Sequence, residues 1–462
     1  MLRHVMLFVV LSALLYGALA YGQALPGTIG ANNSLISTIG INGEIKSWNF
    51  TNDFGLKWSI FNLSLIGPAQ IFPYDTDIIG FNLGILSIKN NTIVGISLAT
   101  IASYCANLYG VQSSLFYNEI GMDGGLIQVT IGANKVGNNY LGYEFGFMNN
   151  VNNNYLGLQM SLYDNHVGND FFGVQLSLSL GDLIYLFSPS YYTTSLNEEE
   201  QGNTVGHDFF GIQMCPGFNV VDGDSYGFQF GYFGGNIDMG NLIGLQVGVM
   251  QNVVGKSSFG LQTSLWGNFF SRNLNKPITL DETHSTNEYL NGPLIVSLIH
   301  NVGDVTHSYY GLLASGFFNQ GGSIYGIGIS CCNILSDNIY GILIGGCNVC
   351  INLPSGIGII SSLVNIYIEK QDENTNNVFI GANTAFILNV GGNIAGIDVA
   401  PINVIRDMYG CQIGVVNIAN HMNGLQIGFF NYAQSLHGIQ LGGINISAKN
   451  GLPFMVGGNI SL

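Results

Sequence analysis

One polar side chain recurs at a fixed place in a repeated motif, and its chemistry is the first question that this chain raises. The motif is Gly-x-Gln, and in two related copies a carboxylate stands where the glutamine would be. Amides and carboxylates offer hydrogen bonds, and the same position also accepts a charge. These positions are the candidate site residues on the polar face of the repeat: Gln112, Glu144, Gln159, Gln175, Gln213, Gln229, Gln246, Gln262, Asp398, Gln412, Gln426 and Gln440.

Seven cysteines supply the reactive thiols, and an odd number leaves at least one unpaired within the chain. Cys347 and Cys350 have C-x-x-C spacing, but a strand places residues three apart on opposite faces, which argues against zinc or redox chemistry. Cys332 and Cys347 occupy the same place one repeat apart. They could form a disulfide between neighbouring strands, or they could be small apolar side chains that fill the repeat.

No motif for hydrolysis, nucleotide binding or calcium binding stands out. The histidines are scattered; His421 and His437 fall where we expect turns between repeats, with no partner that would orient a metal ligand. The sequence therefore predicts no catalytic residue, no cofactor and no metal, and we expect a protein that is not an enzyme. An enzyme with its site in the long loops is a minor alternative.

The polar positions belong to a short repeat. Gly410–Asn417, Gly424–Asn431 and Gly438–Asn445 are successive copies 14 residues apart, and weaker copies at steps of 14 to 17 residues reach back to about residue 80. A fixed short period indicates units that bury their surface by stacking on each other. Apolar residues stand on both sides of the polar position, as Leu158 and Met160 do beside Gln159. This period of two predicts strands with one polar and one apolar face.

A second polar residue breaks this alternation in the late units. Asn lies seven residues after the glycine, as Asn417 and Asn431 do, where a regular strand would place it on the apolar face. A β-bulge would restore the faces, with Leu425, Ile427 and Phe429 on one side and Gln426 and Asn431 on the other. Two short strands joined at a sharp bend are the alternative, and we favour the bulge.

Composition restricts the class of protein. Charged residues make up 8% of the chain, Gly accounts for 65 of 462 residues, and the mean hydropathy is positive. A soluble domain carries about 25% charged residues, so the outer surface is expected to meet lipid or other copies of the chain. The net charge of −16 and the absence of clustered Lys and Arg argue against a nucleic-acid partner.

The chain divides into three segments by pattern. Residues 1–24 read as a signal peptide, with Arg3 and His4 before a short apolar core. Residues 25–79 are a lead-in, and residues 80–462 form the repetitive β domain. Polar insertions interrupt the repeat near 183–208, 270–293 and 367–378, and these loops are where recognition of a host or surface ligand would reside.

Three blocks resemble a spirochaete-type bacterial surface-repeat family with runs of Gly-Leu-Gln-Ile-Gly-x-x-Asn. They are the units at Gly424–Asn445, the introductory block from Pro68 to Leu83, and the closing segment Gly451–Leu462. The resemblance covers about residues 60–462. It implies export and a location at the outer membrane or cell surface, and it implies no catalytic residues.

The fold class that this sequence predicts is all-β, with many short antiparallel strands that close into a membrane β-barrel. A step of 14 to 17 residues fits a membrane strand of about 9–11 residues plus a turn, with outer-membrane lipid as the partner. The alternative is a surface β-repeat array or solenoid, in which the Gln and Asn positions would form ladders. The corresponding functions are an exported, non-catalytic outer-membrane or cell-surface protein with a structural, pore or surface-interaction role, or a soluble surface-exposed adhesin.

Overall fold

The structure is a computed structural model of the chain, and it describes residues 58–66, 69–178, 202–232, 234–270, 289–303, 307–351, 356–368, 378–450 and 452–461. All of these belong to the second of two compact units, Asn49–Leu462. The predicted signal peptide, most of the lead-in, and most of the three insertions lie outside the described residues. Every described secondary-structure element is a strand, and no helix in this part of the chain is long and apolar enough to cross a membrane.

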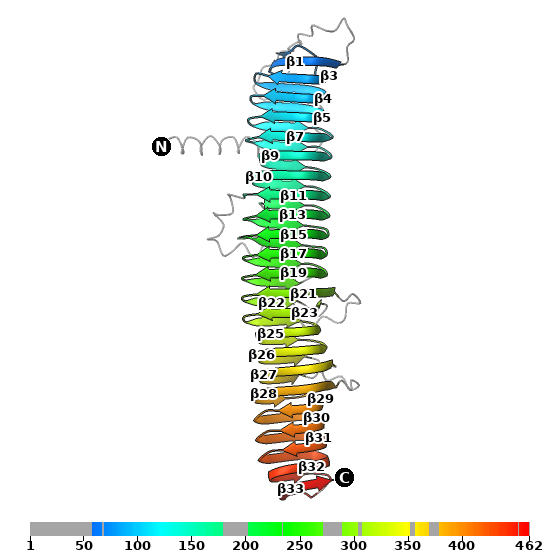
Figure 1. Cartoon of the computed structure of the whole chain (residues 1–462), viewed down its shortest axis with the longest axis vertical. Helices are drawn as coiled ribbons and strands as arrows, with labels where there is room; N and C mark the ends of the chain where they lie inside the picture. Colours follow the sequence, from blue (N-terminus) through cyan, green and yellow to red (C-terminus); the bar gives the residue numbers. More distant parts are fainter. Residues whose placement is uncertain are drawn as a thin grey trace, which may run out of the picture. The chain divides into compact units, whose positions relative to one another are not determined.

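The strands stack along a single column (Figure 1). In chain order their bounds are β1 Trp58–Ile66, β2 Ala69–Gln70, β3 Asp77–Gly84, β4 Ser87–Ala99, β5 Ala102–Ser114, β6 Tyr117–Ile120, β7 Gly124–Thr130, β8 Ala133–Val136, β9 Tyr140–Val151, β10 Tyr155–Val167, β11 Phe171–Ser177, β12 Gly202–Val205, β13 Phe209–Cys215, β14 Phe218–Val221, β15 Ser225–Gly231, β16 Gly235–Asp238 and β17 Leu242–Gly248. They continue with β18 Gln251–Val254, β19 Ser258–Ser264, β20 Gly267–Phe270, β21 Tyr289–Ser297, β22 His300–Gly303, β23 His307–Ser315, β24 Phe318–Gly321, β25 Ile324–Leu335, β26 Ile339–Ile351, β27 Gly356–Ile368, β28 Phe379–Val390, β29 Asn393–Val399, β30 Ile402–Ile413, β31 Val416–Ile427, β32 Phe430–Ser447 and β33 Met455–Ser461.

Neighbouring strands run parallel, and equivalent residues of successive repeats lie opposite each other. Gly157 is paired with Gly173 and Gln159 with Gln175 between β10 and β11, and the same register continues into β13. Only two described pairings are antiparallel: the short β1–β2 contact, and β32–β33 at the C-terminal end. Each repeat is therefore one turn of a β-solenoid with about 20 turns.

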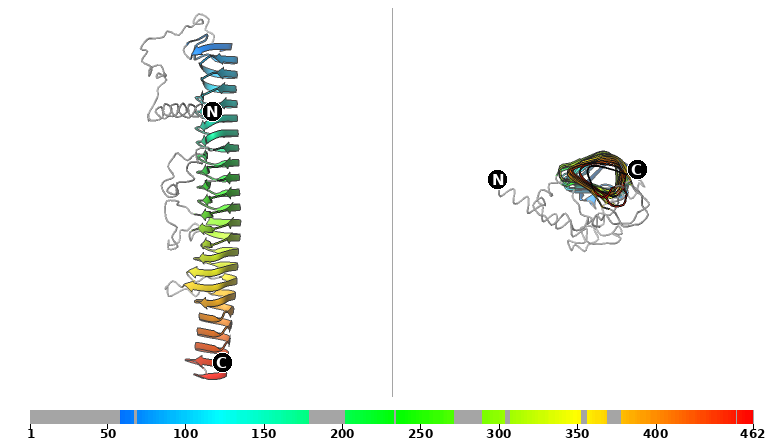
Figure 2. Two further views of the ribbon diagram at one scale, coloured as in Figure 1. Left: turned by 90° about the vertical axis from the view of Figure 1, so that its left-hand side faces the viewer. Right: turned by 90° about the horizontal axis from the view of Figure 1, so that it is seen from below.

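The predicted antiparallel barrel is wrong, and the solenoid alternative describes the fold. The step of 14 to 17 residues fits both, because a membrane strand with its turn and one complete coil of a narrow solenoid need about the same length of chain. In this protein the chain closes one coil per repeat, so the strand neighbours are one repeat apart and must run in the same direction. Figure 2 shows the coils superimposed when the column is viewed from its end.

Each coil contains a strand at the repeating position, which carries Gly-x-Gln in many coils, then a corner, and a strand with a buried asparagine. β13 and β14 form such a pair, separated by a bend, and contribute Gln213 and Asn219 to the interior. In β26 the two parts form one continuous strand. Near Gly424 the predicted faces are correct, since Gln426 and Asn431 are buried and Phe429 is exposed. The predicted bulge is replaced there by a bend, because β31 ends at Ile427 and β32 begins at Phe430.

The repeating glycine is required by the close approach of the coils. Gly244 has φ of +148°, a region that L-residues with side chains rarely adopt, and a Cβ atom there would lie 1.9 Å from the carbonyl oxygen of Gly227 in the preceding coil. The same contact recurs along the stack. Sterics of the backbone therefore explain why the repeat begins with glycine.

The interior consists of columns of like residues. Tyr155, Phe171 and Phe209 stack on each other inside the column, with ring centroids 5.3 and 5.7 Å apart. A valine column that includes Val205 and Val221 lies beside them, fully buried. The parallel stack also extends before residue 80, because β1 is paired with β3. Stacking of similar side chains therefore forms the narrow core.

Candidate functional site

The structure places the predicted polar positions inside the column, where they hold successive coils together. Gln175 Nε2 donates to Gln159 Oε1 at 2.9 Å, Gln213 Nε2 donates to Gln175 Oε1, and the same contact continues through Gln229 to Gln246. Near the C-terminal end Gln440 donates to Gln426, which donates to Gln412. All of the predicted positions are buried, with at most 1% of each residue exposed.

Two of the predicted glutamines lie outside these donor chains. Gln112 Nε2 donates to Ser103, and its Oε1 accepts from Gln128, a glutamine that the sequence pattern missed. Gln128 was missed because Leu126, with φ of 96°, takes the place of the repeating glycine. Gln262 is buried at the end of one run, and neither of its side-chain polar atoms has a hydrogen-bond partner.

The second interior ladder is formed by asparagine and runs without a break from Asn118 to Asn445. In each coil the asparagine Nδ2 donates to the asparagine Oδ1 of the next coil, at 2.7 to 3.2 Å across the series, as Asn118 does to Asn134 at 3.0 Å and Asn431 to Asn445 at 2.8 Å. Most members also donate to a backbone carbonyl, for example Asn252 to Thr263 O. The amide dipoles of this ladder all point in one direction, so neighbouring bonds polarise each other.

Sequence reasoning found the asparagines of the late units and missed the early ones. Asn165, Asn219 and Asn252 follow their glycine by eight residues, and Asn236 follows by nine, so a spacing of seven does not detect them. The corner between the two strands absorbs the additional residues. The recurrence of Asn near the end of each unit, with a variable gap, was the signal that could have found them.

The two predicted carboxylates replace an amide inside the column. Burial raises the pKa of Glu144 to about 8 and that of Asp398 to about 7. Glu144 Oε2 accepts from Gln159 Nε2 at 3.0 Å, while Glu144 Oε1 and Gln128 Oε1, on paired positions of adjacent strands, both lack a partner. A proton on Glu144 Oε1 gives it the donor that a glutamine would supply toward Gln128.

A third buried carboxylate, Asp238, was missed because it occupies the valine column. It accepts from Ser225 Oγ at 2.7 Å and from Gln229 and Gln246 Nε2, both at 2.8 Å. Burial raises its pKa to about 7. The neighbouring coils carry Val221 and Val254 at this position, so this coil replaces apolar contacts with a hydrogen-bonded carboxyl.

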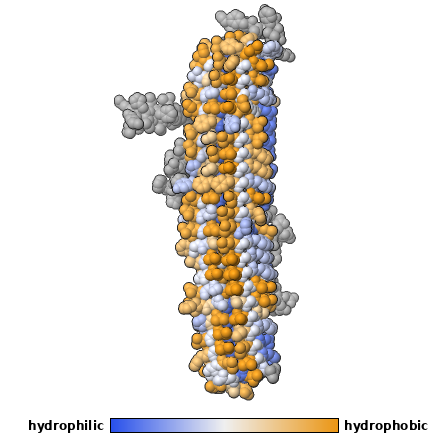
Figure 3. All heavy atoms as spheres, in the orientation of Figure 1, coloured by the Kyte–Doolittle hydropathy of each residue, from blue (hydrophilic) through white to orange (hydrophobic). Residues whose placement is uncertain are grey.

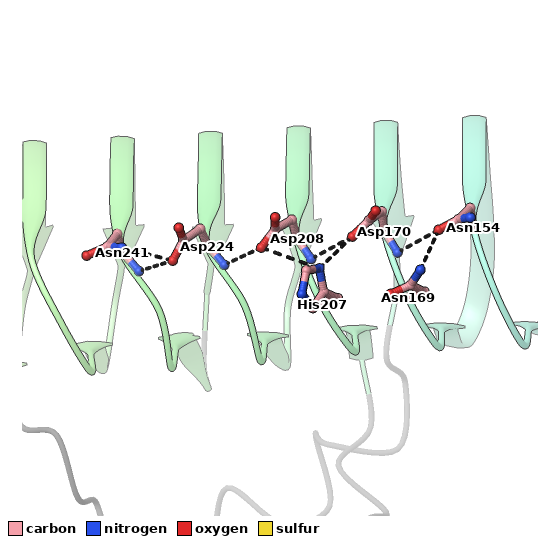
Figure 4. Close-up of polar contacts among 7 residues, drawn as sticks. All are labelled: Asn154, Asn169, Asp170, His207, Asp208, Asp224 and Asn241. Atoms are coloured by element: carbon pink, nitrogen blue, oxygen red, sulfur yellow. Dashed lines mark hydrogen bonds and ion pairs between the residues drawn. The ribbon is translucent and has the colours of Figure 1, made fainter.

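A column of Asp and Asn side chains lines one corner of successive coils (Figure 4). Asp170 Oδ1 accepts the backbone N–H of Asp208, and Asp208 Oδ1 accepts that of Asp224. His207 Nδ1 lies 2.7 Å from Asp170 Oδ1 and 3.6 Å from Asp208 Oδ1, and the hydrogen bond with Asp170 is the main cause of the raised pKa of His207.

Asp170, His207 and Asp208 place three potential metal ligands within 4.8 Å of one another. The carboxylates already satisfy the backbone of the next coil, and 60% of the His207 side chain is exposed. A structural role as caps of the corner accounts for these contacts.

In the remaining repeats His421 and His437 lie within β31 and β32, so the predicted turn location is wrong.

No disulfide joins any of the seven cysteines, all of which lie in described strands. Cys332 and Cys347 lie opposite each other in β25 and β26, as the repeat predicted, and point outward from the asparagine strand. Cys350 is buried in the core, where burial raises its pKa to about 12. Cys347 and Cys350 thus lie on opposite faces of β26, as the C-x-x-C spacing predicted.

The apolar face of the Gly-x-Gln strand points outward. The repeating position is that of the motif glycine, from Gly80 to Gly438. We define the outer face as the side chains that lie one residue before, one residue after and three residues after this position. None of these positions carries Asp, Glu, Lys or Arg. Many of its members are largely exposed, including Leu141, Ile212, Phe259, Ile357 and Leu441. Figure 3 shows hydrophobic side chains in stripes along the column.

Aromatic residues of the outer face form columns. The ring centroids of Phe172 and Phe210 are 4.5 Å apart, as are those of Phe210 and Tyr226, and Tyr310, Tyr325 and Tyr340 form a second stack. Because the strands are parallel, these rings lie on one line.

Comparison with family models, with curated proteins and with solved structures gave no match to this chain.

Proposed function

We propose that this protein is a non-catalytic β-solenoid rod of the bacterial cell surface, exported by its N-terminal segment, with a structural or surface-interaction role. The observation that carries the proposal is the burial of the recurring polar side chains. The Gln and Asn positions, which are the chemically most regular feature of the chain, are used to hydrogen-bond one coil to the next. Buried ladder residues cannot contact a substrate, so they supply stiffness and not catalysis.

The resemblance to spirochaete-type surface-repeat proteins supports the location in this proposal, together with the signal-peptide pattern of residues 1–24. Outer-membrane lipid was expected as a partner because of the barrel, and that reason no longer holds. The proposal therefore keeps the cell surface and assigns the contacts to the outside of the rod, where the outer face lies.

The location can be tested by expressing the full chain and a variant that lacks residues 1–24 in a bacterial host. We expect the full chain to be processed near residue 24 and to be degraded by protease added to intact cells. The truncated variant should remain protected in the cytoplasm, as should an internal cytoplasmic marker. Equal protection of both chains would contradict export, and processing without surface accessibility would place the rod in the periplasm.

A further inference from the structure

The outer face is a candidate interaction surface because of its size and its lack of charge. The coils are about 4.8 Å apart, so about 20 turns span on the order of 100 Å. The three outward positions span about 13 Å along each strand, which gives a face of roughly 1,300 Å². The largest apolar patch of a typical monomer is about 300–600 Å², and a standard interface buries about 800 Å² per partner. One such face is therefore large enough for a stable association.

We infer that two copies of this chain associate through their outer faces. A second copy has the same spacing between coils, so its ridges of side chains fit into the grooves of the first along the whole length. Two β-sheet faces pack in this way about 10 Å apart, as the dry interfaces of stacked sheets do. The Phe172–Phe210–Tyr226 column is one such ridge, with rings 4.5 Å apart.

The charge distribution favours a second copy over a lipid surface. A protein that lies on a membrane usually carries Lys and Arg near its apolar surface, because these residues are attracted to anionic headgroups. In the described part of the chain the basic residues are few and lie on separate coils: Lys89, Lys135, Lys256, Arg406 and Lys449. The net charge of −16 disfavours both an anionic membrane and a second copy, but none of this charge lies on the outer face.

The described coils keep this face continuous from one side of each insertion to the other. The insertions fall between β11 and β12, between β20 and β21, and between β27 and β28. All three points are ends of strands. The register of the Gly-x-Gln strands is unbroken across them, as the pairing of β11 with β13 shows. Association along the face therefore requires no rearrangement of the described coils, and it does not depend on where the protein is located.

Two native cysteines provide a direct test. Cys411 follows Gly410 and points outward on the outer face, whereas Cys347 points outward on the asparagine strand, and both are partly exposed. We expect Cys411 of the full chain to become protected from a maleimide reagent as the protein concentration rises, while Cys347 keeps its labelling rate. Sedimentation velocity without detergent should show a dimer over the same range of concentration.

Charged substitutions distinguish the outer face from the rest of the surface. Ile243→Lys with Leu245→Lys puts two charges on the exposed outer face of β17, and we expect a monomer in which Cys411 reacts at every concentration. The matched control is Gln251→Lys with Gln320→Lys, which adds the same charge outward on the asparagine strand and should leave the dimer intact. Circular dichroism confirms that both variants keep their β structure.

Three results would overturn the inference. The first is a monomeric full chain at tens of micromolar with Cys411 and Cys347 labelled alike. The second is a dimer that the Ile243→Lys and Leu245→Lys variant retains with Cys411 still protected. The third is a monomer that floats with phosphatidylcholine vesicles and is protected at Cys411 only there, which would assign the outer face to lipid. None of these results bears on export, so this inference and the proposed location can fail separately.

Discussion

Replacement of Glu144 by glutamine should stabilise the column at alkaline pH, and the effect should disappear in acid. Glu144 is fully buried between Gln128 and Gln159, and burial raises its pKa from 4.5 to about 8. The neutral carboxyl can donate to Gln128 Oε1 and accept from Gln159, as a glutamine does. The charged form loses the donor and is desolvated, so it weakens the contact between coils.

The sign and size of this effect follow from proton linkage. The folded-state pKa lies above the unfolded value, so the stability contributed by the neutral carboxyl is fully present below about pH 4.5 and is lost as the pH rises through about 8. Each pH unit between these values costs about 1.4 kcal/mol, which adds up to about 5 kcal/mol across the interval. Glu144→Gln has no proton to lose and should escape this loss.

The assay is urea unfolding of the full chain and of Glu144→Gln at pH 5 and pH 9, with hydrogen exchange of peptides from β9 to β11 as a local readout. The local readout is needed because long repeat arrays do not unfold in one cooperative step. Glu119→Gln, which changes a partly exposed carboxyl in β6, is the control, and the exchange of its peptides from β9 to β11 should match that of the wild type. The reasoning is refuted if wild type and Glu144→Gln differ by the same amount at both pH values.

Three further changes test other parts of the column. Asp238→Asn should reduce the loss of stability between pH 4 and pH 8, because the pKa of the Asp238 carboxyl in the folded chain, about 7, lies above its ordinary value of 3.8. Urea midpoints that fall in parallel for the variant and the wild type would contradict this. Asn252→Leu removes hydrogen bonds to Asn236, Asn268 and Thr263 and should lower the free energy of unfolding in urea by about 2–4 kcal/mol. Asn445→Leu, at the end of the ladder, should cost less. Equal losses in the two variants would argue against a continuous ladder. Gly244→Ala places a Cβ 1.9 Å from a carbonyl oxygen and should cost at least about 3 kcal/mol or prevent folding. Gly458→Ala, whose Cβ would lie 3.6 Å from its nearest neighbour, should be tolerated in the same solubility and melting measurements.

The sequence determined the repeat, the strands and the alternation of faces. Glycine at the head of each unit, with apolar residues on both sides of Gln159 or Gln426, could only be a two-faced strand. It also indicated that Cys332 and Cys347 are equivalent and that Cys347 and Cys350 lie on opposite faces. These properties are local, because the direction of successive side chains depends only on the extended backbone.

The tertiary structure decided the direction of the strands and which face is buried. A step of 14 to 17 residues is compatible with an antiparallel strand and turn and also with one parallel coil, so the period could not choose between them. The early asparagines were hidden for a related reason, since the corners vary in length and only the closed coil brings Asn219 beside Asn236.

The burial of the polar face follows from the same closure. Inside a narrow coil most asparagines and many glutamines meet an identical amide in a neighbouring coil, so these polar side chains satisfy each other. The apolar side chains are left outside, where they form the outer face. An alternating pattern specifies two faces, and only stacking of one coil on the next determines that glutamine and asparagine belong to the interior.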